Sequence, residues 1–222
     1  PSLLPPPSYP RFGKILGMSS RKGSMVYVSE LLEQARAVMV EGQARSPNTR
    51  VEEGQEESTA QAVAVSALIV QDLAKKRTRD YSFSWQQALA SNGDTGVKLQ
   101  YTHARLYSLI TTCSPKLEVD MAGNEVETGG LVEPIALELV YIIGRWDEVL
   151  SSSAASLEPQ TLVQYLFSLA NCTSRALKQL PVKSIIDTDP SLARARLLLF
   201  SCSQRVMGEG LRVLGVTPLN RL

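Results

Sequence analysis

The stretch that decides the fold runs from Gly93 to Leu106 and reads GDTGVKLQYTHARL. Gly93 follows an asparagine, a pair that is typical of a turn, and Asp94 or Thr95 can then cap a helix. We expect this helix to continue to about Thr112, because leucine and isoleucine recur on one side of it. The chain therefore turns and begins a long amphipathic helix at this point.

Further helices are expected on both sides of this stretch. The run from Ala60 to Lys75 is apolar on nearly every side, as in a buried helix. After a loop around residues 118–130, the pattern predicts helices over 133–150, 159–180 and 190 to about 208 or 215. The sequence therefore predicts a mainly α protein, in which four or five helices form a bundle over residues 56–222.

The composition is that of an ordinary globular protein, with 44% hydrophobic residues, 20% charged residues and a net charge of +1. This balance excludes a uniformly basic nucleic-acid binder, although not a local basic surface. No apolar run reaches the roughly 18 residues of a membrane span, so we expect no membrane contact. Cys113, Cys172 and Cys202 are far apart and lack metal-ligand spacing, so we expect reduced thiols in an intracellular protein and no bound metal.

A helical projection of the stretch after Gly96 separates two faces. The apolar face consists of Leu99, Leu106, Leu109 and Ile110, and the polar face of Lys98, Tyr101, Arg105 and Ser108. Tyr101 and Arg105 are four residues apart and can form an RNA-binding platform, in which the ring stacks on a base and the guanidinium pairs with phosphate. The alternative is a solvated face on which Tyr101 packs against the stem of Arg105.

His103 and the arginines of the last helix are further candidates for a functional role, and each can also be explained by a purely structural one. His103 has no cysteine or aspartate at a useful spacing, so we expect a hydrogen-bonded structural histidine rather than a catalytic one. In the last helix three arginines, Arg194, Arg205 and Arg212, align on one side together with Ser201. That arginine stripe could steer a phosphate backbone or could be a solvated face.

Near the start, residues 17–23 read GMSSRKG and combine small hydroxyl residues, two cations and flanking glycines. Such a loop can hold phosphates, although its spacing is not that of a Walker A loop and a surface turn is the alternative. The acidic residues between 41 and 58 are interpreted as a solvated linker or the frayed end of a helix rather than a catalytic cluster. The proline-rich start, which lacks methionine, indicates a truncated piece of a longer protein.

Taken together and in this order, these segments resemble the C-terminal half of an arginyl-tRNA synthetase, a class I aminoacyl-tRNA synthetase. Residues 17–23 resemble that family's K-M-S-K-S loop, and the stretch from Gly93 to Leu106 resembles the start of its anticodon-binding domain. The Tyr81-x-Phe83-x-Trp85 run and the ending from Gly210 to Leu222 also fit. The resemblance covers residues 12–222 and is closest to the mitochondrial enzymes of animals.

The resemblance implies a fold and a division of the chain. It implies a helical bundle of the DALR anticodon-binding type, preceded by the small C-terminal remnant of a class I nucleotide-binding catalytic domain. The catalytic end with its loop and linker would cover residues 1–55. The helical domain would cover residues 56–222, with a DALR core at about 95–222.

The resemblance also implies an arginine–tRNA ligase, which joins arginine to its tRNA at the expense of ATP. ATP would be a substrate, accompanied by Mg²⁺, and the partners would be arginine tRNA and arginine, with a monomer in the mitochondrial matrix or alternatively the cytoplasm. The residues assigned to ATP are Met18, Ser19, Ser20, Arg21 and Lys22. The residues assigned to the anticodon loop are Tyr101, Arg105, Tyr165 and Leu222.

The chain departs from the family pattern in three respects. It ends in leucine, where the family usually has methionine, and its loop differs from K-M-S-K-S at several positions. It also has no H-I-G-H motif, which needs two histidines where this sequence has one. We therefore expect the 222 residues alone to be unable to form arginyl-adenylate. A stand-alone, non-catalytic tRNA- or RNA-binding module is the alternative, and a helical protein-interaction module is a third.

Overall fold

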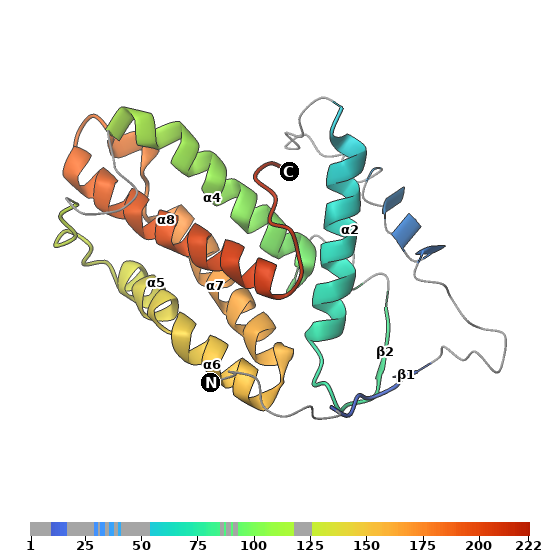
Figure 1. Cartoon of the computed structure of the whole chain (residues 1–222). Coiled ribbons are helices and arrows are strands. Elements are labelled where there is room, and N and C mark those ends of the chain that lie inside the picture. The colour runs from blue at the N-terminus through green and yellow to red at the C-terminus, as the bar shows by residue number, and fades with distance from the viewer. Residues whose placement is uncertain are drawn as a thin grey trace, which may run out of the picture.

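The computed structural model describes residues 10–16, several positions between 29 and 40, 54–84, 87, 90, 93–117 and 126–222. The described positions between 29 and 40 are helical. The remaining described helices are α2 (Glu56–Leu73), α4 (Gly96–Leu117), α5 (Pro134–Gly144), α6 (Trp146–Ser156), α7 (Pro159–Gln179), the 3₁₀ turn η2 (Lys183–Ile185) and α8 (Pro190–Val213). The predicted mainly α bundle is confirmed (Figure 1).

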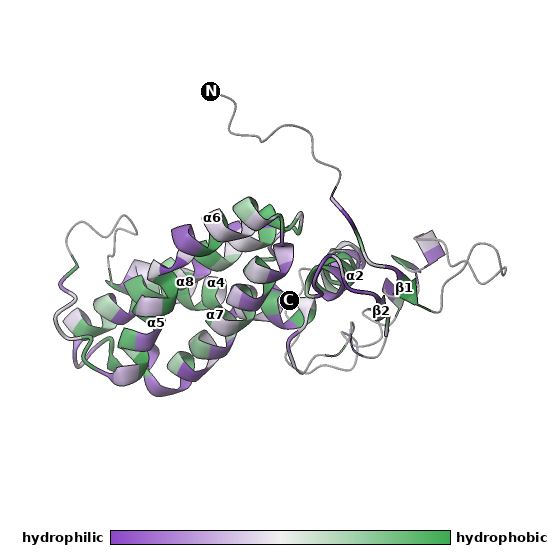
Figure 2. Cartoon of the chain, turned by 90° about the horizontal axis from the view of Figure 1, so that it is seen from below, coloured by the Kyte–Doolittle hydropathy of each residue, from purple (hydrophilic) through white to green (hydrophobic). Residues whose placement is uncertain are grey.

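A short parallel pair of strands lies at the C-terminal end of α2. β1 (Ile15–Leu16) pairs with β2 (Tyr81–Ser82), with Ile15 opposite Tyr81. Gly13 precedes β1 at a close backbone approach, where a Cβ atom would lie 2.2 Å from the carbonyl oxygen of Arg79. Seen from below (Figure 2), α2 and this pair lie beside the bundle formed by α4 to α8.

The start of α4 is fixed by the turn that the sequence predicts. Gly93 has a positive φ of 88°, and the Thr95 hydroxyl accepts from the Lys98 backbone N–H at 3.3 Å, so Thr95 caps the helix. Gly96 allows α4 to cross α2 closely, since a Cβ atom there would lie 2.3 Å from the Ser66 carbonyl oxygen. The helix ends at Leu117 rather than near Thr112. Pro115 lies within its last turn and does not stop the helix.

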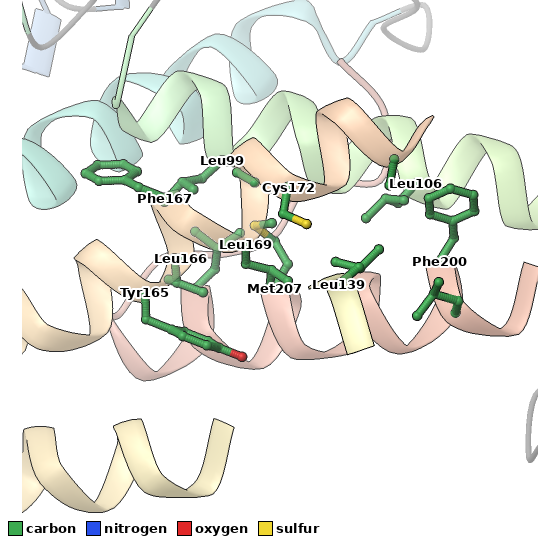
Figure 3. Close-up of a cluster of buried hydrophobic side chains, with 14 of the residues drawn as sticks. Leu99, Leu106, Leu139, Tyr165, Leu166, Phe167, Leu169, Cys172, Phe200 and Met207 are labelled. Atoms are coloured by element: carbon green, nitrogen blue, oxygen red, sulfur yellow. The ribbon is translucent and has the colours of Figure 1, made fainter. Parts of the chain in front are cut away.

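The hydrophobic core lies between α4, α5, α7 and α8 (Figure 3). Leu99 and Leu106 of α4, Leu166 and Leu169 of α7, and Phe200 of α8 are completely buried. Burial of side chains of this size stabilises the fold by about 1.5–3 kcal/mol each. In the part of the chain that the structure describes, no helix is both long enough and apolar enough to cross a membrane.

The helix predicted over 133–150 is wrong in one respect, because the structure has two helices there. α5 ends at Gly144, Arg145 leaves the helical conformation with φ −82° and ψ 0°, and α6 begins at Trp146. Both helices pack against α7, with Leu139 and Val149 buried on their inner sides. The break at Gly144 therefore separates two helices that both contact α7.

An ion pair between the buried Arg196 of α8 and the partly exposed Glu133 joins the start of α5 to α8. Arg196 is 7% exposed; its Nη2 pairs with the Glu133 carboxylate and its Nη1 donates to the Pro181 carbonyl oxygen at 2.9 Å. Burial by itself raises the pKa of Glu133, but hydrogen bonding and the charge of Arg196 outweigh it, so the pKa is lowered. The carboxylate is therefore ionised, and its partner holds the loop before α5 in place.

Replacing Arg196 with leucine is expected to lower the free energy of unfolding by about 2 kcal/mol, because the Glu133 carboxylate loses its donor. The loss is smaller than for a completely buried pair, since the Glu133 side chain keeps 29% exposure. Urea denaturation measures the change. The matched control Arg175→Leu breaks the exposed pair with Glu138 and is expected to cost less than about 0.5 kcal/mol. Equal losses in the two variants would contradict the structural role of Arg196.

Candidate nucleic-acid interface

An open groove of about 730 Å³ lies between α4 and the last residues of the chain. Its walls come from Tyr101, Arg105, Tyr107, Ser108, Thr111, Thr112, Asn220, Arg221 and Leu222, together with Ala104. The C-terminal segment, residues 214–222, returns past the end of α8 and runs beside α4 and α2 (Figure 1). Two parts of the sequence that are more than a hundred residues apart therefore form one surface, which we call the α4–tail groove.

The two residues predicted to face outward do so. Tyr101 is 48% exposed and Arg105 is also exposed, whereas Leu99 and Leu106 on the opposite face are completely buried. Among the described residues, no ion pair is recorded for Arg105. Both the ring and the guanidinium are accessible to a ligand in the groove.

Lys98 is turned away from this pair, although the helical projection placed it on the same face. Its ammonium group contacts Asp94 at 3.3 Å and also donates to Asn171 on α7. Asn171 in turn donates to Asp94 at 3.2 Å. Lys98 therefore links the start of α4 to α7 and does not belong to the groove.

Gln100 holds the C-terminal segment against α4, and sequence reasoning missed it. Its side chain is completely buried; its Nε2 donates to the Thr217 carbonyl oxygen at 2.7 Å and to the Ser66 hydroxyl at 2.8 Å. Its Oε1 accepts from the Leu219 backbone N–H at 2.9 Å. The available signal was weak, since Gln100 follows the buried Leu99 but precedes the exposed Tyr101; only its burial shows that the amide needs partners.

His103 is the second residue that holds this segment. It is 2% exposed, and its Nε2 lies 2.8 Å from the amide nitrogen of Gln204, which can only donate. Nε2 must then be the acceptor, so Nδ1 carries the proton and donates to the Leu219 carbonyl oxygen at 2.7 Å. The hydrogen-bonded structural histidine predicted from the sequence is confirmed, and its partners require the neutral ring.

Burial lowers the pKa of His103, the hydrogen bond to Leu219 opposes that effect, and the charge of Arg212 lowers the pKa further. Below pH about 6.5 the unfolded chain binds a proton at this residue that the folded protein resists. Stability is therefore lost as the pH falls through that value. Thermal unfolding between pH 7.5 and 5 measures this loss.

The control for this titration is His103→Asn, which keeps a neutral nitrogen donor but does not ionise. We expect a flatter dependence of stability on pH in the variant than in the wild type. The chain has no other histidine, so no second imidazole masks the comparison. Identical pH dependence in both proteins would contradict the assignment of a neutral, buried His103.

The structure does not bring Tyr165 to the α4–tail groove. Tyr165 is 7% exposed, its hydroxyl donates to the Ile142 carbonyl oxygen at 3.0 Å, and its ring centroid lies 6.1 Å from that of Trp146. Burial raises the pKa of Tyr165 to about 12, while the charge of Arg145 lowers it. Tyr165 therefore joins α7 to the end of α5, and the tRNA contact predicted for it stays a prediction.

The remaining predicted site residues are Leu222, the arginine stripe and the ATP-binding segment, and the structure describes only the first two. Leu222 lines the groove and is half-buried. In the arginine stripe, Arg194 donates to the Leu117 carbonyl oxygen at 2.9 Å and Arg212 pairs with Glu209 at 2.7 Å, while Arg205 is exposed. The ATP-binding residues predicted from Met18 to Lys22 lie outside the described residues.

Family models match both parts of the chain. A model of the DALR anticodon binding domain matches residues 99–222, and a model of the class I (R) catalytic domain of tRNA synthetases matches residues 9–85. The second match includes α2, which packs against α4 of the first. The division of the chain at residue 55 stays a prediction.

Curated relatives and solved structures agree with these matches. The probable cytoplasmic arginine–tRNA ligase of Dictyostelium discoideum is 37% identical over 211 residues, which are 95% of this chain and 34% of that protein. The probable mitochondrial arginine–tRNA ligase of Bos taurus is also 37% identical, over 95% of this chain and 35% of that protein. The chain thus spans about a third of the length of these relatives.

The fold is that of arginyl-tRNA synthetases of known structure. The Thermus thermophilus enzyme aligns with a TM-score of 0.77 at 23% identity, over 89% of this chain and 32% of that one. The Plasmodium falciparum enzyme aligns with a TM-score of 0.76 at 19% identity, over 95% of this chain and 34% of that one. Because the DALR model covers more than half of the residues and the curated relatives are arginine–tRNA ligases, the chain belongs to the arginyl-tRNA synthetase family, of which it carries the anticodon-binding domain and part of the class I catalytic domain.

Proposed function

We propose that this chain is part of an arginine–tRNA ligase and that its α4–tail groove binds the anticodon loop of arginine tRNA. The observation that carries the proposal is the exposure of Tyr101 and Arg105 side by side in an open groove, within the region that matches the DALR model. The relatives are named arginine–tRNA ligases. We propose the same activity, with arginine, ATP and tRNA as substrates, for the protein of which this chain forms a part.

The groove can recognise an RNA loop by three kinds of contact. The Tyr101 ring stacks on an unpaired base, which contributes about 1–3 kcal/mol for each base. The Arg105 guanidinium pairs with a phosphate or with the edge of a base. Leu222 adds an apolar contact from the opposite wall, and the fixed backbone of the tail keeps that wall in place.

The position of the tail explains how the groove stays preorganised without RNA. Gln100 and His103 bind both the N–H and the carbonyl oxygen of Leu219, three residues before Leu222. Because the C-terminal segment is already ordered before RNA binds, binding does not incur the entropic cost of ordering it. We therefore assign Gln100 and His103 as positioning residues rather than RNA contacts.

The catalytic part of the proposal concerns the segment from Met18 to Lys22. In a class I enzyme this segment would close over the phosphates of ATP, with Ser19, Ser20, Arg21 and Lys22 as donors and Mg²⁺ bound with the nucleotide. Support comes from the sequence and from the catalytic-domain match over residues 9–85. We assign no residue of this chain as a ligand of Mg²⁺.

The 222 residues alone are expected to give no arginine-dependent exchange of pyrophosphate into ATP, with or without tRNA. The reason is the missing pair of histidines that the class I nucleotide site needs. Exchange above the background of a protein-free reaction would overturn this prediction.

For the cellular setting we propose a monomer in the mitochondrial matrix, with the cytoplasm as the alternative. Mitochondrial and cytoplasmic relatives are equally identical to the chain, at 37%. Fractionation of cells that express the natural gene product decides between the two compartments.

The experiment that tests anticodon binding compares two RNA stem-loops by fluorescence anisotropy. One carries the anticodon loop of an arginine tRNA, and the other has the same stem with an anticodon for a different amino acid. The chain is expected to bind the arginine stem-loop at least tenfold more tightly. Equal affinity for both RNAs, or no binding at moderate salt, would contradict the proposal.

A further inference from the structure

The outer side of α5 is as apolar as its inner side. Only one of its eleven residues is charged. Leu139 is buried in the bundle, whereas Leu137, Val140 and Tyr141 are 55%, 48% and 67% exposed. These three residues and the exposed Gly144 recur every three or four positions and form one stripe along the helix, which we call the α5 stripe. A helix that is apolar on all sides is typical of a helix buried on all sides, so the stripe is expected to have a partner.

The α5 stripe lies away from the α4–tail groove and from the region that matches the catalytic-domain model. α5 packs against α7 and α8, which lie between it and α4 in Figure 1. α2, β1 and β2, which belong to the catalytic-domain match, lie at the other end of the molecule in Figures 1 and 2. In the described part of the chain, therefore, no element covers the stripe, and RNA in the α4–tail groove leaves it free.

The α5 stripe is complementary in shape to a copy of itself. If two α5 helices pack antiparallel about a two-fold axis between Val140 and Tyr141, Leu137 of each copy lies opposite Gly144 of the other. The largest aliphatic side chain of the stripe then meets the residue without a side chain. Gly144 has room for this contact, because a Cβ atom placed there would meet no atom within 4 Å. Val140 of each copy lies opposite Tyr141 of the other.

The charges beside the α5 stripe also favour a second copy over a strongly charged partner. Glu138 pairs with Arg175 of α7, and Arg145 pairs with Glu148 at 3.2 Å. All four side chains are exposed, and they supply two charges of each sign. An acidic or a basic partner gains nothing from such a balanced surface, whereas a second copy presents the same balanced pattern and is not repelled.

We propose that the α5 stripe binds a second copy of this chain, with the two α5 helices antiparallel about a two-fold axis between Val140 and Tyr141. The inference goes beyond the proposed function and does not depend on RNA binding. Each copy keeps its own α4–tail groove, so the pair is expected to bind one stem-loop per chain.

The size of the α5 stripe sets the strength of this association. Side chains of this kind offer on the order of 100 Å² each at these exposures, so the stripe covers well under the roughly 800 Å² per partner of a stable complex. We therefore expect a weak pair, with a dissociation constant of about 10–100 µM. The chain is then a monomer at lower concentrations, as proposed for the cell.

Sedimentation equilibrium without RNA tests the pairing, over chain concentrations from about 5 to about 500 µM, which bracket the expected dissociation constant. The wild-type mass is expected to rise toward twice the chain mass. Leu137→Glu and Gly144→Lys each place an unpaired charge in the contact and are expected to weaken the association at least tenfold. Val213→Glu, at an exposed apolar position at the end of α8, is the matched control and is expected to associate like the wild type.

Mixing the two charged variants tests the arrangement itself. In an antiparallel pair made of one Leu137→Glu chain and one Gly144→Lys chain, the glutamate lies opposite the lysine, while the other half of the contact is that of the wild type. The equimolar mixture is therefore expected to recover association that neither variant shows alone. Thermal melts and stem-loop affinities within about twofold of the wild type are expected to show that both variants are folded.

A wild-type chain that stays monomeric over the whole concentration range would overturn the proposal and leave the α5 stripe to a different protein partner. Undiminished association of Leu137→Glu would overturn it as well, and so would a mixture that remains monomeric. Failure of the proposed function looks different, because it shows in the stem-loop comparison and leaves the sedimentation of the free chain unchanged.

Discussion

Replacing Arg105 with glutamate is expected to weaken binding of the arginine anticodon stem-loop about 100-fold at moderate salt. The substitution removes a charge-assisted hydrogen bond to the RNA, worth about 1.5–3 kcal/mol, and adds a repulsion between carboxylate and phosphate. Arg105 is exposed, so the change leaves the core of the bundle intact. Fluorescence anisotropy with the labelled stem-loop measures the effect.

The control for this reversal is Lys178→Glu, which makes the same change of charge on an exposed position of α7. We expect it to weaken the stem-loop by less than about threefold, since only long-range electrostatics change. If Arg105→Glu leaves the affinity unchanged, the RNA-binding face lies elsewhere on the chain. Equal losses in both variants would indicate general charge attraction rather than a site.

Replacing Gln100 with leucine is expected to reduce the affinity for the same stem-loop about 30- to 100-fold, although Gln100 does not face the RNA. The leucine keeps the apolar bulk but leaves the Thr217 carbonyl oxygen and the Leu219 N–H without their partner. Each unsatisfied buried group costs about 1–3 kcal/mol, which favours release of the tail. The groove then loses the wall that carries Leu222.

Hydrogen exchange identifies this mechanism directly. The Leu219 amide, which is bonded to Gln100 in the folded protein, is expected to lose its protection in the variant, while amides in the core of α7 and α8 keep theirs. Gln164→Leu, at an exposed position of α7, is the matched control and is expected to change neither property. A protected Leu219 amide together with full RNA affinity would contradict the role of Gln100.

Much of the bundle could be predicted because its signals are local. The turn at Gly93, the cap at Thr95 and the apolar side of α4 lie within one short stretch, and each acts on its immediate neighbours. The outward orientation of Tyr101 and Arg105 follows from the same helical period. The break between α5 and α6 was missed although Gly144 lies at it, because the apolar pattern continues on both sides of this glycine, from Ile142 and Ile143 to Trp146.

The groove itself could be predicted only in part, because three of its lining residues, Asn220, Arg221 and Leu222, come from the other end of the chain. Gln100 and Leu219 are 119 positions apart in the sequence. The hydrogen bond between them is a single contact, which leaves no periodic pattern in the sequence. The Arg196–Glu133 pair was missed for the same reason. The packing of Tyr165 was likewise not predicted, because its bond to the Ile142 carbonyl oxygen joins two helices 23 residues apart in the sequence.

The most direct measurement of the central claim is a photocross-link from the RNA to the protein. A stem-loop of arginine tRNA with a photoreactive base in its anticodon is bound to the chain and irradiated, and the modified peptides are identified by mass spectrometry. The account predicts cross-links at Tyr101 or within residues 220–222, which line the groove from opposite sides. Cross-links confined to other helices, with none at these positions, would contradict it.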